Sequence, residues 1–147
     1  MKKTIIIFFT FIAFLYNAQI RKSNLLIMID EKPCLIVNNL QLESQTMKSI
    51  NANYVVGTID ISENDYTRLL TDQSMSFNLN FESILANHSL SSKYEVTIPK
   101  IYLNQKYIII NIFNMNIKNY RKKYSELIKN NKEYYVVIET PNSMKFD

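Results

Sequence analysis

The stretch KYIIINIFNMNI, residues 106–117, decides the expected fold class. Its first half is apolar at almost every position, whereas its second half alternates between apolar side chains and asparagine. An alternation with a period of two is typical of a β-strand, in which successive side chains point to opposite faces of the sheet. We therefore expect a central strand whose second half reaches solvent. Because strands are usually about five or six residues long, we also expect a bend or bulge within it.

Two other stretches repeat this alternation more clearly. Residues 75–81 place Phe77 and Phe81 on the apolar side and polar side chains on the other, and residues 94–98 follow the same pattern. A sheet with one apolar and one polar face is typically antiparallel, because parallel sheets are covered on both faces. Further apolar or β-branched runs predict strands at residues 25–29, 34–37, 54–59 and 134–138.

Turns and helices are predicted between these strands. A charged cluster followed by proline at residues 30–33 predicts the turn of a hairpin. Ser62 stands three residues before Asp65, and a serine at that spacing caps a helix by accepting an unpaired backbone N–H, so we expect a helix over residues 63–71. A second helix is expected within residues 118–130, where apolar side chains recur at helical spacing.

The expected fold is mainly β. Seven or eight short strands, one or two short helices and the lack of a βαβ rhythm favour a two-layer antiparallel β-sandwich. The alternative is an α+β fold in which a helix packs on a single antiparallel sheet. No internal repeat or linker divides the chain, and we expect one domain over residues 19–147.

The first 18 residues have the three-part layout of a secretory signal peptide. Lys2 and Lys3 are followed by an apolar run at residues 5–15, and Ala18 offers a small residue for cleavage. The apolar run is shorter than the roughly 20 residues that cross a bilayer, so an uncleaved membrane anchor is the alternative that we favour less. We therefore expect export to the periplasm or out of the cell. Removing this segment lowers the net charge from +4 to +2, because two lysines leave with it.

Absent residue types exclude several classes of chemistry. Gly57 is the only glycine, which excludes glycine-rich loops that cradle phosphates. A single histidine and a single cysteine exclude the common zinc sites, two-cysteine redox motifs and an intrachain disulfide. We expect Cys34 to be a buried, unreactive thiol, with an intermolecular bridge as the alternative. No metal or cofactor is predicted, and we do not expect an enzyme.

His88 is the one candidate for a catalytic base. It lies in a predicted loop beside Ser89 and could form a hydrolytic site together with a carboxylate such as Asp60. However, no serine is flanked by the glycines of a nucleophile elbow. A solvated loop histidine explains the same residues more simply, so a hydrolase built around His88 is the alternative function.

A basic and aromatic segment is the candidate binding surface. It consists of Lys118, Tyr120, Arg121, Lys122, Lys123 and Tyr124. Such a surface attracts anionic lipid headgroups, acidic glycans or nucleic acid, and its tyrosines can stack on rings or lie at an interface. Nucleic acid is the least natural partner of an exported protein. The alternative is that both tyrosines pack inward and the charges form a solvated helix face.

The sequence alone does not identify the function. Our leading hypothesis is an exported, non-catalytic binding or structural protein of the bacterial cell envelope. Its partner would be a protein or a glycan, held through loops or a sheet edge. The alternatives are a hydrolase around His88 and attachment to anionic membrane surfaces through residues 118–124. The oligomeric state is left open.

Overall fold

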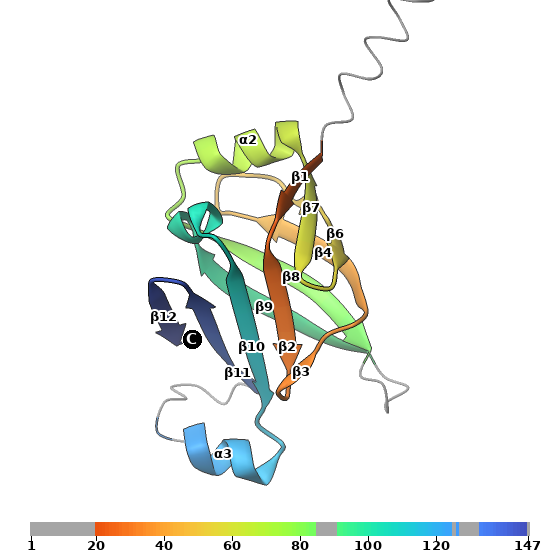
Figure 1. Ribbon diagram of the computed structural model, residues 1–147, viewed down its shortest axis with the longest axis vertical. Coiled ribbons are helices and arrows are strands. Elements are labelled where there is room, and N and C mark those ends of the chain that lie inside the picture. Colours follow the sequence, from red (N-terminus) through yellow and green to blue (C-terminus); the bar gives the residue numbers. More distant parts are fainter. Residues whose placement is uncertain (1–19, 85–90, 125, 127–132, 147) are drawn as a thin grey trace, which may run out of the picture.

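The computed structural model describes residues 20–84, 91–124, 126 and 133–146. The predicted signal peptide and His88 therefore lie outside the described residues. Within them, twelve strands form three sheets, and two α-helices and a 3-10 helix connect the strands (Figure 1). The mainly β fold with few helices that the sequence predicts is confirmed. The strand number exceeds the predicted seven or eight because some strands, such as β5, are only two residues long and leave no pattern in the sequence.

The strands have the following bounds. The five-stranded sheet has the order β12-β11-β10-β2-β3, with β12 Ser143–Phe146, β11 Tyr134–Thr140, β10 Ile108–Asn114, β2 Leu25–Ile29 and β3 Lys32–Pro33. The four-stranded sheet has the order β5-β4-β8-β9, with β5 Ile50–Asn51, β4 Val37–Glu43, β8 Ser76–Ile84 and β9 Ser91–Pro99. The three-stranded sheet has the order β1-β7-β6, with β1 Ile20–Ser23, β7 Thr58–Ser62 and β6 Asn53–Val55.

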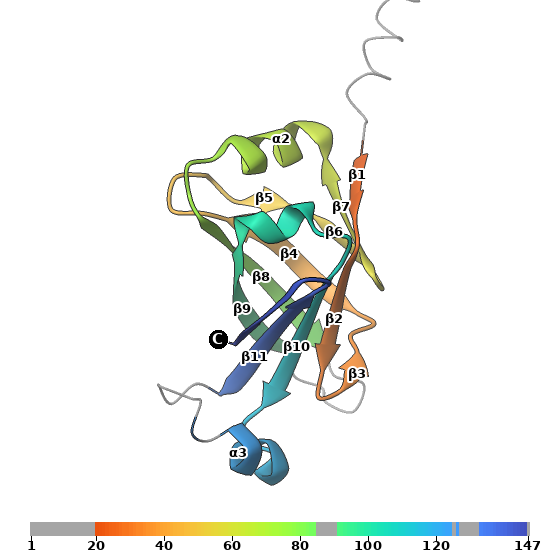
Figure 2. The ribbon, with the colours of Figure 1, turned by 60° about the vertical axis from the view of Figure 1, so that its left-hand side comes forward.

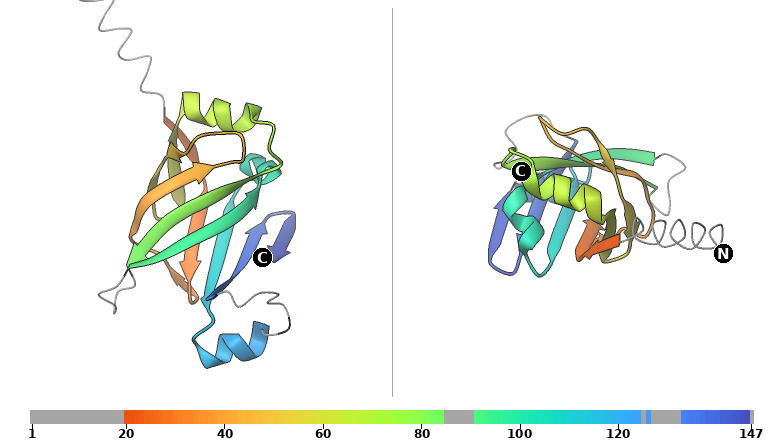
Figure 3. Two further views of the ribbon diagram at one scale, coloured as in Figure 1. Left: turned by 180° about the vertical axis from the view of Figure 1, so that it is seen from behind. Right: turned by 90° about the horizontal axis from the view of Figure 1, so that it is seen from above.

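The five-stranded and four-stranded sheets pack face to face as two layers (Figure 3). Their inner faces share one hydrophobic core, because alternate side chains of longer strands such as β2 and β9 point inward. Side chains without measurable exposure come from both layers and include Ile27, Ile110, Ile138, Leu79, Val96 and Ile98. Fully burying such an aliphatic side chain stabilises the folded state by about 1.5–3 kcal/mol, so this core holds the two layers together.

The central strand β10 is shorter than the stretch that predicted it. It spans Ile108–Asn114 and ends where the backbone turns, since the N–H of Ile117 donates to the carbonyl of Asn114. It pairs antiparallel with β11 but parallel with β2. The parallel pair departs from the all-antiparallel expectation. It forms because the long connection between β2 and β10 brings the chain back to the same end of the sheet, which side-chain alternation cannot reveal.

The strands β1 and β2 form one nearly continuous ribbon that passes from one sheet to another (Figure 1). β1 pairs with β7, whereas β2 pairs with β10. At the junction the N–H of Leu25 donates to the carbonyl of Gly57. Gly57 has a φ of +86°, a conformation that glycine adopts without steric cost, and it lies in the turn between β6 and β7. Residues 54–59, predicted as one strand, therefore form a hairpin.

The predicted turn at residues 30–33 is present, but the strand that follows it differs from the prediction. Asp30 and Glu31 have φ values of 51° and 65° and form a two-residue hairpin turn between β2 and β3. Of residues 34–37, predicted as a strand, only Val37 belongs to one. Cys34 leaves the sheet and is buried in the core, where its Sγ lies 3.0 Å from the Oγ of Ser83. The predicted buried thiol is confirmed.

The helix α2, Glu63–Thr71, lies at the predicted position and covers one end of the two layers (Figure 2). The Oγ of Ser62 accepts a hydrogen bond of 3.1 Å from the N–H of Asp65, as the capping pattern predicts. The helix α3, Lys118–Tyr124, lies at the opposite end, and the rest of the predicted helix falls largely outside the described residues. No helix in the described part of the chain is long and apolar enough to span a membrane.

Candidate functional site

The outer face of the four-stranded sheet is polar. The alternation that buries Leu42, Leu79 and Val96 turns their neighbours outward. The left panel of Figure 3 looks onto the strands of this outer face. By their alternation with buried neighbours, the outward side chains are Gln41 and Glu43 on β4, Asn78, Asn80 and Glu82 on β8, and Lys93, Glu95 and Thr97 on β9. The wet face that the sequence predicts for residues 75–81 is therefore part of a three-stranded polar surface.

These side chains lie in rows that follow the pairing of the strands. One row joins Gln41, Asn80 and Glu95, which face one another across β4, β8 and β9. The next row joins Glu43, Asn78 and Thr97. Hydrogen bonds connect the two rows, so the surface is an ordered array.

Amides donate to carboxylates across the rows. The Nδ2 of Asn80 donates to the Oε1 of Glu43 over 2.5 Å, and the Nδ2 of Asn78 donates to the Oε1 of Glu95 over 2.7 Å. The hydroxyl of Thr97 donates to the Oδ1 of Asn78 over 3.1 Å. Hydrogen bonds to ionised carboxylates are stronger than those between neutral groups. These hydrogen bonds therefore favour one orientation of each side chain before any ligand binds.

A hollow of about 450 Å³ opens on this face. Its lining residues are Asn39, Gln41, Asn80, Phe81, Glu82, Lys93, Tyr94, Glu95 and Tyr134. The pairing of β4 with β8 shifts between Asn38 and Gln41, and Asn39 lies in this bulge with a φ of 52°. Bulges redirect side chains at the rims of sheets, and here the bulge brings Asn39 to the hollow.

The side of the hollow next to β9 is closed by Tyr134 from the other layer. Its hydroxyl accepts a hydrogen bond from the N–H of Glu95 and donates one to the carbonyl of the same residue. Its ring packs edge-on against Tyr94, with the ring centroids 5.2 Å apart. Burial raises the pKa of the Tyr94 hydroxyl. The free edge of β9 is further occupied by the Nζ of Lys145, which donates to the carbonyl of Thr97.

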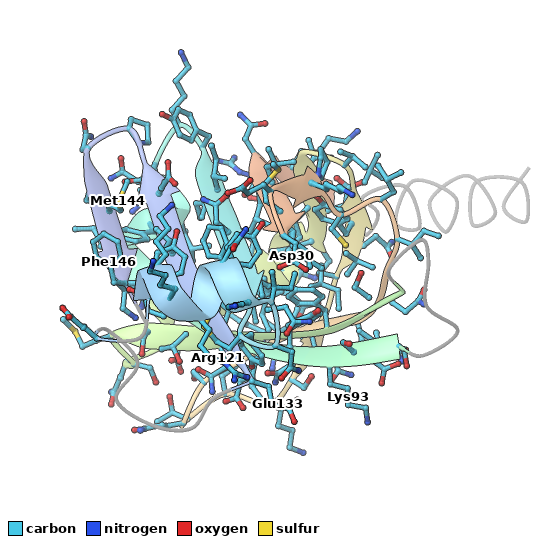
Figure 4. All side chains as sticks on the ribbon, turned by 90° about the horizontal axis from the view of Figure 1, so that it is seen from below. Asp30, Lys93, Arg121, Glu133, Met144 and Phe146 are labelled. Atoms are coloured by element: carbon cyan, nitrogen blue, oxygen red, sulfur yellow. The ribbon has the colours of Figure 1, made fainter. Side chains whose placement is uncertain are left out.

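The charges at the hollow are mixed. The Nζ of Lys93 lies 3.6 Å from a carboxylate oxygen of Glu82, while Glu95 lies one row away. The Lys93 side chain is 84% exposed, on the outer side of β9 (Figure 4). An ion pair so exposed contributes about 0–1 kcal/mol, so it adds little to stability. With one lysine and two glutamates, the lining of the hollow has no excess of positive charge.

The predicted basic and aromatic surface is divided by the structure. Tyr124 is buried and Tyr120 is half-buried, and both pack on Phe113, with ring centroids 4.9 and 5.1 Å away. The two tyrosines thus pack inward, which is the arrangement that the alternative interpretation predicts. Burial is also the main reason why the pKa of Tyr120 is raised. The exposed side chains of the surface are Lys118, Arg121, Lys122 and Lys123.

Acidic residues lie at the same end of the molecule as these cations. Arg121 shares its end of the molecule with Asp30 and Glu133 (Figure 4), and Glu126 is exposed two residues after α3. The Nε of Arg121 donates to the carbonyl of Met115 over 2.9 Å, so part of its guanidinium group serves the fold. Mixed signs at this end reduce its attraction for an anionic surface. Attachment to membranes through residues 118–124 stays a prediction.

The hydrolase hypothesis stays a prediction as well, because His88 lies outside the described residues. Its proposed partner Asp60 is half-buried on β7, and its Oδ1 is buried without a hydrogen-bond partner among the described residues. Lys22 and Asn53 face Asp60 across the three-stranded sheet. In the described ranges, no group of three histidine, cysteine or acidic side chains could hold a metal ion.

One polar cluster was missed by the sequence analysis. The carboxylate of Asp72, at the end of α2, accepts hydrogen bonds from the hydroxyls of Thr46 and Ser44 and from the N–H of Ser74. The hydroxyls of Thr46 and Ser44 hold the pKa of Asp72 well below its usual range. A carboxylate of such low pKa is a poor general base for a serine. The cluster therefore ties the loop that contains Ser44 and Thr46 to the end of α2. Because these two residues lie 26 or more positions before Asp72, no sequence motif indicates the cluster.

Fold and site together define a mainly β protein of two facing sheets that carries an ordered polar hollow on one outer face. Comparisons with protein-family models, with curated proteins and with solved structures find no match to this chain. The sequence predicted the outward side chains of β8 and β9, because they alternate. It did not indicate Asn39 or Tyr134, since their positions depend on a bulge and on contacts between layers.

Proposed function

We propose that the protein is an exported, non-catalytic binding protein of the bacterial cell envelope, and that its ligand occupies the hollow on β4, β8 and β9. The observation that carries this proposal is the set of polar side chains around the hollow that already hydrogen-bond one another, such as Asn80 with Glu43. Binding to a pre-ordered surface costs less conformational entropy than binding to mobile side chains.

The chemistry of the lining also favours binding over catalysis. The lining combines amides, carboxylates, a lysine and the hydroxyl of Tyr134. Tyr134 and Glu95 are already engaged by hydrogen bonds within the fold. A hydrolytic site of the serine or cysteine type would need a nucleophile oriented by a base, and the lining residues contain neither histidine, serine nor cysteine. Export is supported by the signal-peptide layout of residues 1–18.

Co-sedimentation with an insoluble bacterial envelope fraction tests the proposal. Gln41→Ala combined with Asn80→Ala removes two amides from the hollow. Each lost hydrogen bond is worth about 1 kcal/mol, so binding should weaken roughly twenty- to thirty-fold. The matched control is Gln73→Ala combined with Asn104→Ala, which removes two exposed amides elsewhere. If the hollow variant melts normally and still binds like the unmodified protein, the proposal is wrong.

Export is tested separately. Expression of the full chain in a bacterium and sequencing of the product should give a mature N-terminus at Gln19 in the periplasmic or extracellular fraction. Retention of the intact chain in the cytoplasm would contradict this part of the proposal.

A further inference from the structure

We infer that the ligand of the hollow is an uncharged glycan. The inference rests on the proposed function, since it names the class of ligand for the same site. It follows because the surface is poorly suited to three other classes of ligand: peptides bound through their main chain, apolar ligands and strongly charged ligands.

A peptide bound through its main chain does not fit this surface. Strand addition requires a free sheet edge with unpaired N–H and C=O groups. β8, which runs through the middle of the hollow, is paired on both sides, with β4 and with β9. The outer edge of β9 is occupied at Glu95 by Tyr134 and at Thr97 by Lys145. The hollow therefore offers side chains rather than backbone to its ligand.

An apolar ligand does not fit either. Phe81 and Tyr94 are the apolar members of the lining next to Tyr134, and they are only 2% and 7% exposed. None of the large exposed apolar side chains of the described residues is part of the lining, and two of them, Met144 and Phe146, lie on β12 in the other sheet, away from Lys93 (Figure 4). Binding in the hollow therefore depends on hydrogen bonds, with little apolar area to bury.

A strongly charged ligand gains little from the hollow. The single lysine of the lining, Lys93, already pairs with Glu82. An anionic ligand would meet Glu82 and Glu95, and like charges repel it. A cationic ligand would meet Lys93, which repels it, and would share Glu95 with the amide of Asn78. An uncharged ligand avoids both costs.

The array of donors and acceptors matches a ligand rich in hydroxyl groups. An amide has two N–H donors and a carbonyl acceptor, and a carboxylate has two oxygens. Of the groups that line the hollow, Asn80 uses one N–H on Glu43 and Glu95 accepts the amide of Asn78 at one oxygen, so Asn80 keeps its second N–H and Glu95 its second oxygen for a ligand. A hydroxyl group both donates and accepts. Neighbouring side chains within a row lie at the strand spacing of about 4.8 Å, and successive rows lie two residues, or about 6.8 Å, apart along the strands, which suits a ligand with hydroxyls along its length.

Chemical treatment of the envelope fraction tests the inference. Periodate cleaves the carbon–carbon bond between neighbouring hydroxyl-bearing carbons and so destroys most glycans, whereas protease destroys proteins. We expect quenched periodate treatment to lower co-sedimentation at least ten-fold and protease treatment to leave it unchanged. Periodate leaves 1,4-linked N-acetylhexosamine chains intact, so a hydrolase of those linkages is applied as well. Binding that survives both treatments overturns the inference. The proposed function would still stand in that case, provided that Gln41→Ala with Asn80→Ala weakens binding.

Direct titration provides a second readout. The probes are neutral oligosaccharides of glucose, galactose, mannose and N-acetylglucosamine, titrated calorimetrically into the purified protein. We expect one or more to bind, with an affinity that changes less than two-fold between about 0.05 and about 0.5 M salt, because screening acts on charged ligands. Glu95→Gln keeps the shape of the lining and removes a charge, so it should alter affinity less than Asn80→Ala. If no neutral oligosaccharide binds at millimolar concentration, the inference fails.

Discussion

The hydroxyl of Tyr134 lies 2.9 Å from the backbone nitrogen of Glu95, so a side chain of one layer closes the free edge of the other. The same hydroxyl lies 3.1 Å from the carbonyl oxygen of Glu95, to which it donates. Exposed edge strands pair readily with other chains, and proteins protect them by covering the edge. Here a single hydroxyl satisfies both backbone groups of one edge residue, beside the hollow.

Tyr134→Phe tests this closure. The change keeps the ring against Tyr94 and removes only the hydroxyl, which leaves two backbone groups of Glu95 without their partner. We expect the free energy of unfolding to fall by about 1 kcal/mol, because water reaches this edge and replaces part of the lost bonding. Urea denaturation measures the change. Tyr107→Phe, at an exposed tyrosine, should change stability by less than about 0.5 kcal/mol, and an equal loss there would contradict the explanation.

The turn between β2 and β3 contains a residue in an unfavourable conformation. Glu31 has a φ of 65°, which costs an L-residue roughly 1–2 kcal/mol and costs glycine little. Glu31→Gly should therefore raise the free energy of unfolding by about 1 kcal/mol. The neighbouring Lys32 lies in a strand, where Lys32→Gly should lower it by about 0.5–1 kcal/mol. Thermal and urea unfolding of both variants check the opposite signs.

The Asp72 cluster predicts a dependence of stability on pH. Hydrogen bonds from Thr46 and Ser44 lower the pKa of Asp72 in the folded state. A lowered pKa stabilises the fold at pH values above the unfolded-state pKa of about 3.9, and this stabilisation is lost as the pH falls through and below that value. Asp72→Asn should therefore destabilise the protein at neutral pH and converge with the unmodified protein in acid.

Urea midpoints at about pH 7 and about pH 3 measure this convergence. Glu126→Gln is the control, since Glu126 is an exposed carboxylate two residues beyond α3. Its effect should be small at both pH values. If the urea midpoints of Asp72→Asn and the unmodified protein differ more at about pH 3 than at about pH 7, the ionised carboxylate of Asp72 is not the form that stabilises the fold.

The helix α3 gives a stability prediction that separates its tyrosines from its charges. The ring of Tyr124 stacks on Tyr135, with centroids 4.8 Å apart, and is almost fully buried. Tyr124→Ala should lower the free energy of unfolding by about 3 kcal/mol. Lys118→Ala, at an exposed position, should change it by less than about 0.5 kcal/mol. A small loss for Tyr124→Ala in urea denaturation would mean that the tyrosine does not anchor the helix.

How far the sequence predicts this molecule depends on whether a feature is local. The alternation around Phe77 and Phe81 fixed which side of β8 is buried, and Ser62 fixed the start of α2, because both signals act within a few residues. The parallel pairing of β2 with β10 could not be predicted, since alternation specifies a face but no partner. For the hollow, the outward side chains were predictable from the local alternation. Its shape was not predictable, because the shape depends on the bulge in β4 and on the second layer.

Asn39 allows binding to be separated from folding. Its φ of 52° lies in the region that glycine and asparagine tolerate best, and it lines the hollow. Asn39→Gly should therefore preserve the bulge and change the free energy of unfolding by less than about 1 kcal/mol. The same change removes one amide from the hollow and should weaken binding to the envelope fraction roughly five-fold, the equivalent of about 1 kcal/mol.

Asn38→Gly is the matched control for this change, because Asn38 is the exposed residue immediately before Asn39 and is not part of the lining. It faces Glu82 across the strand pair, so glycine there should cost stability without weakening binding. Co-sedimentation and urea denaturation of both variants give the two readouts. Equal binding by Asn39→Gly and the unmodified protein would mean that the ligand does not reach the bulge, and the site would then be confined to the rows around Asn80.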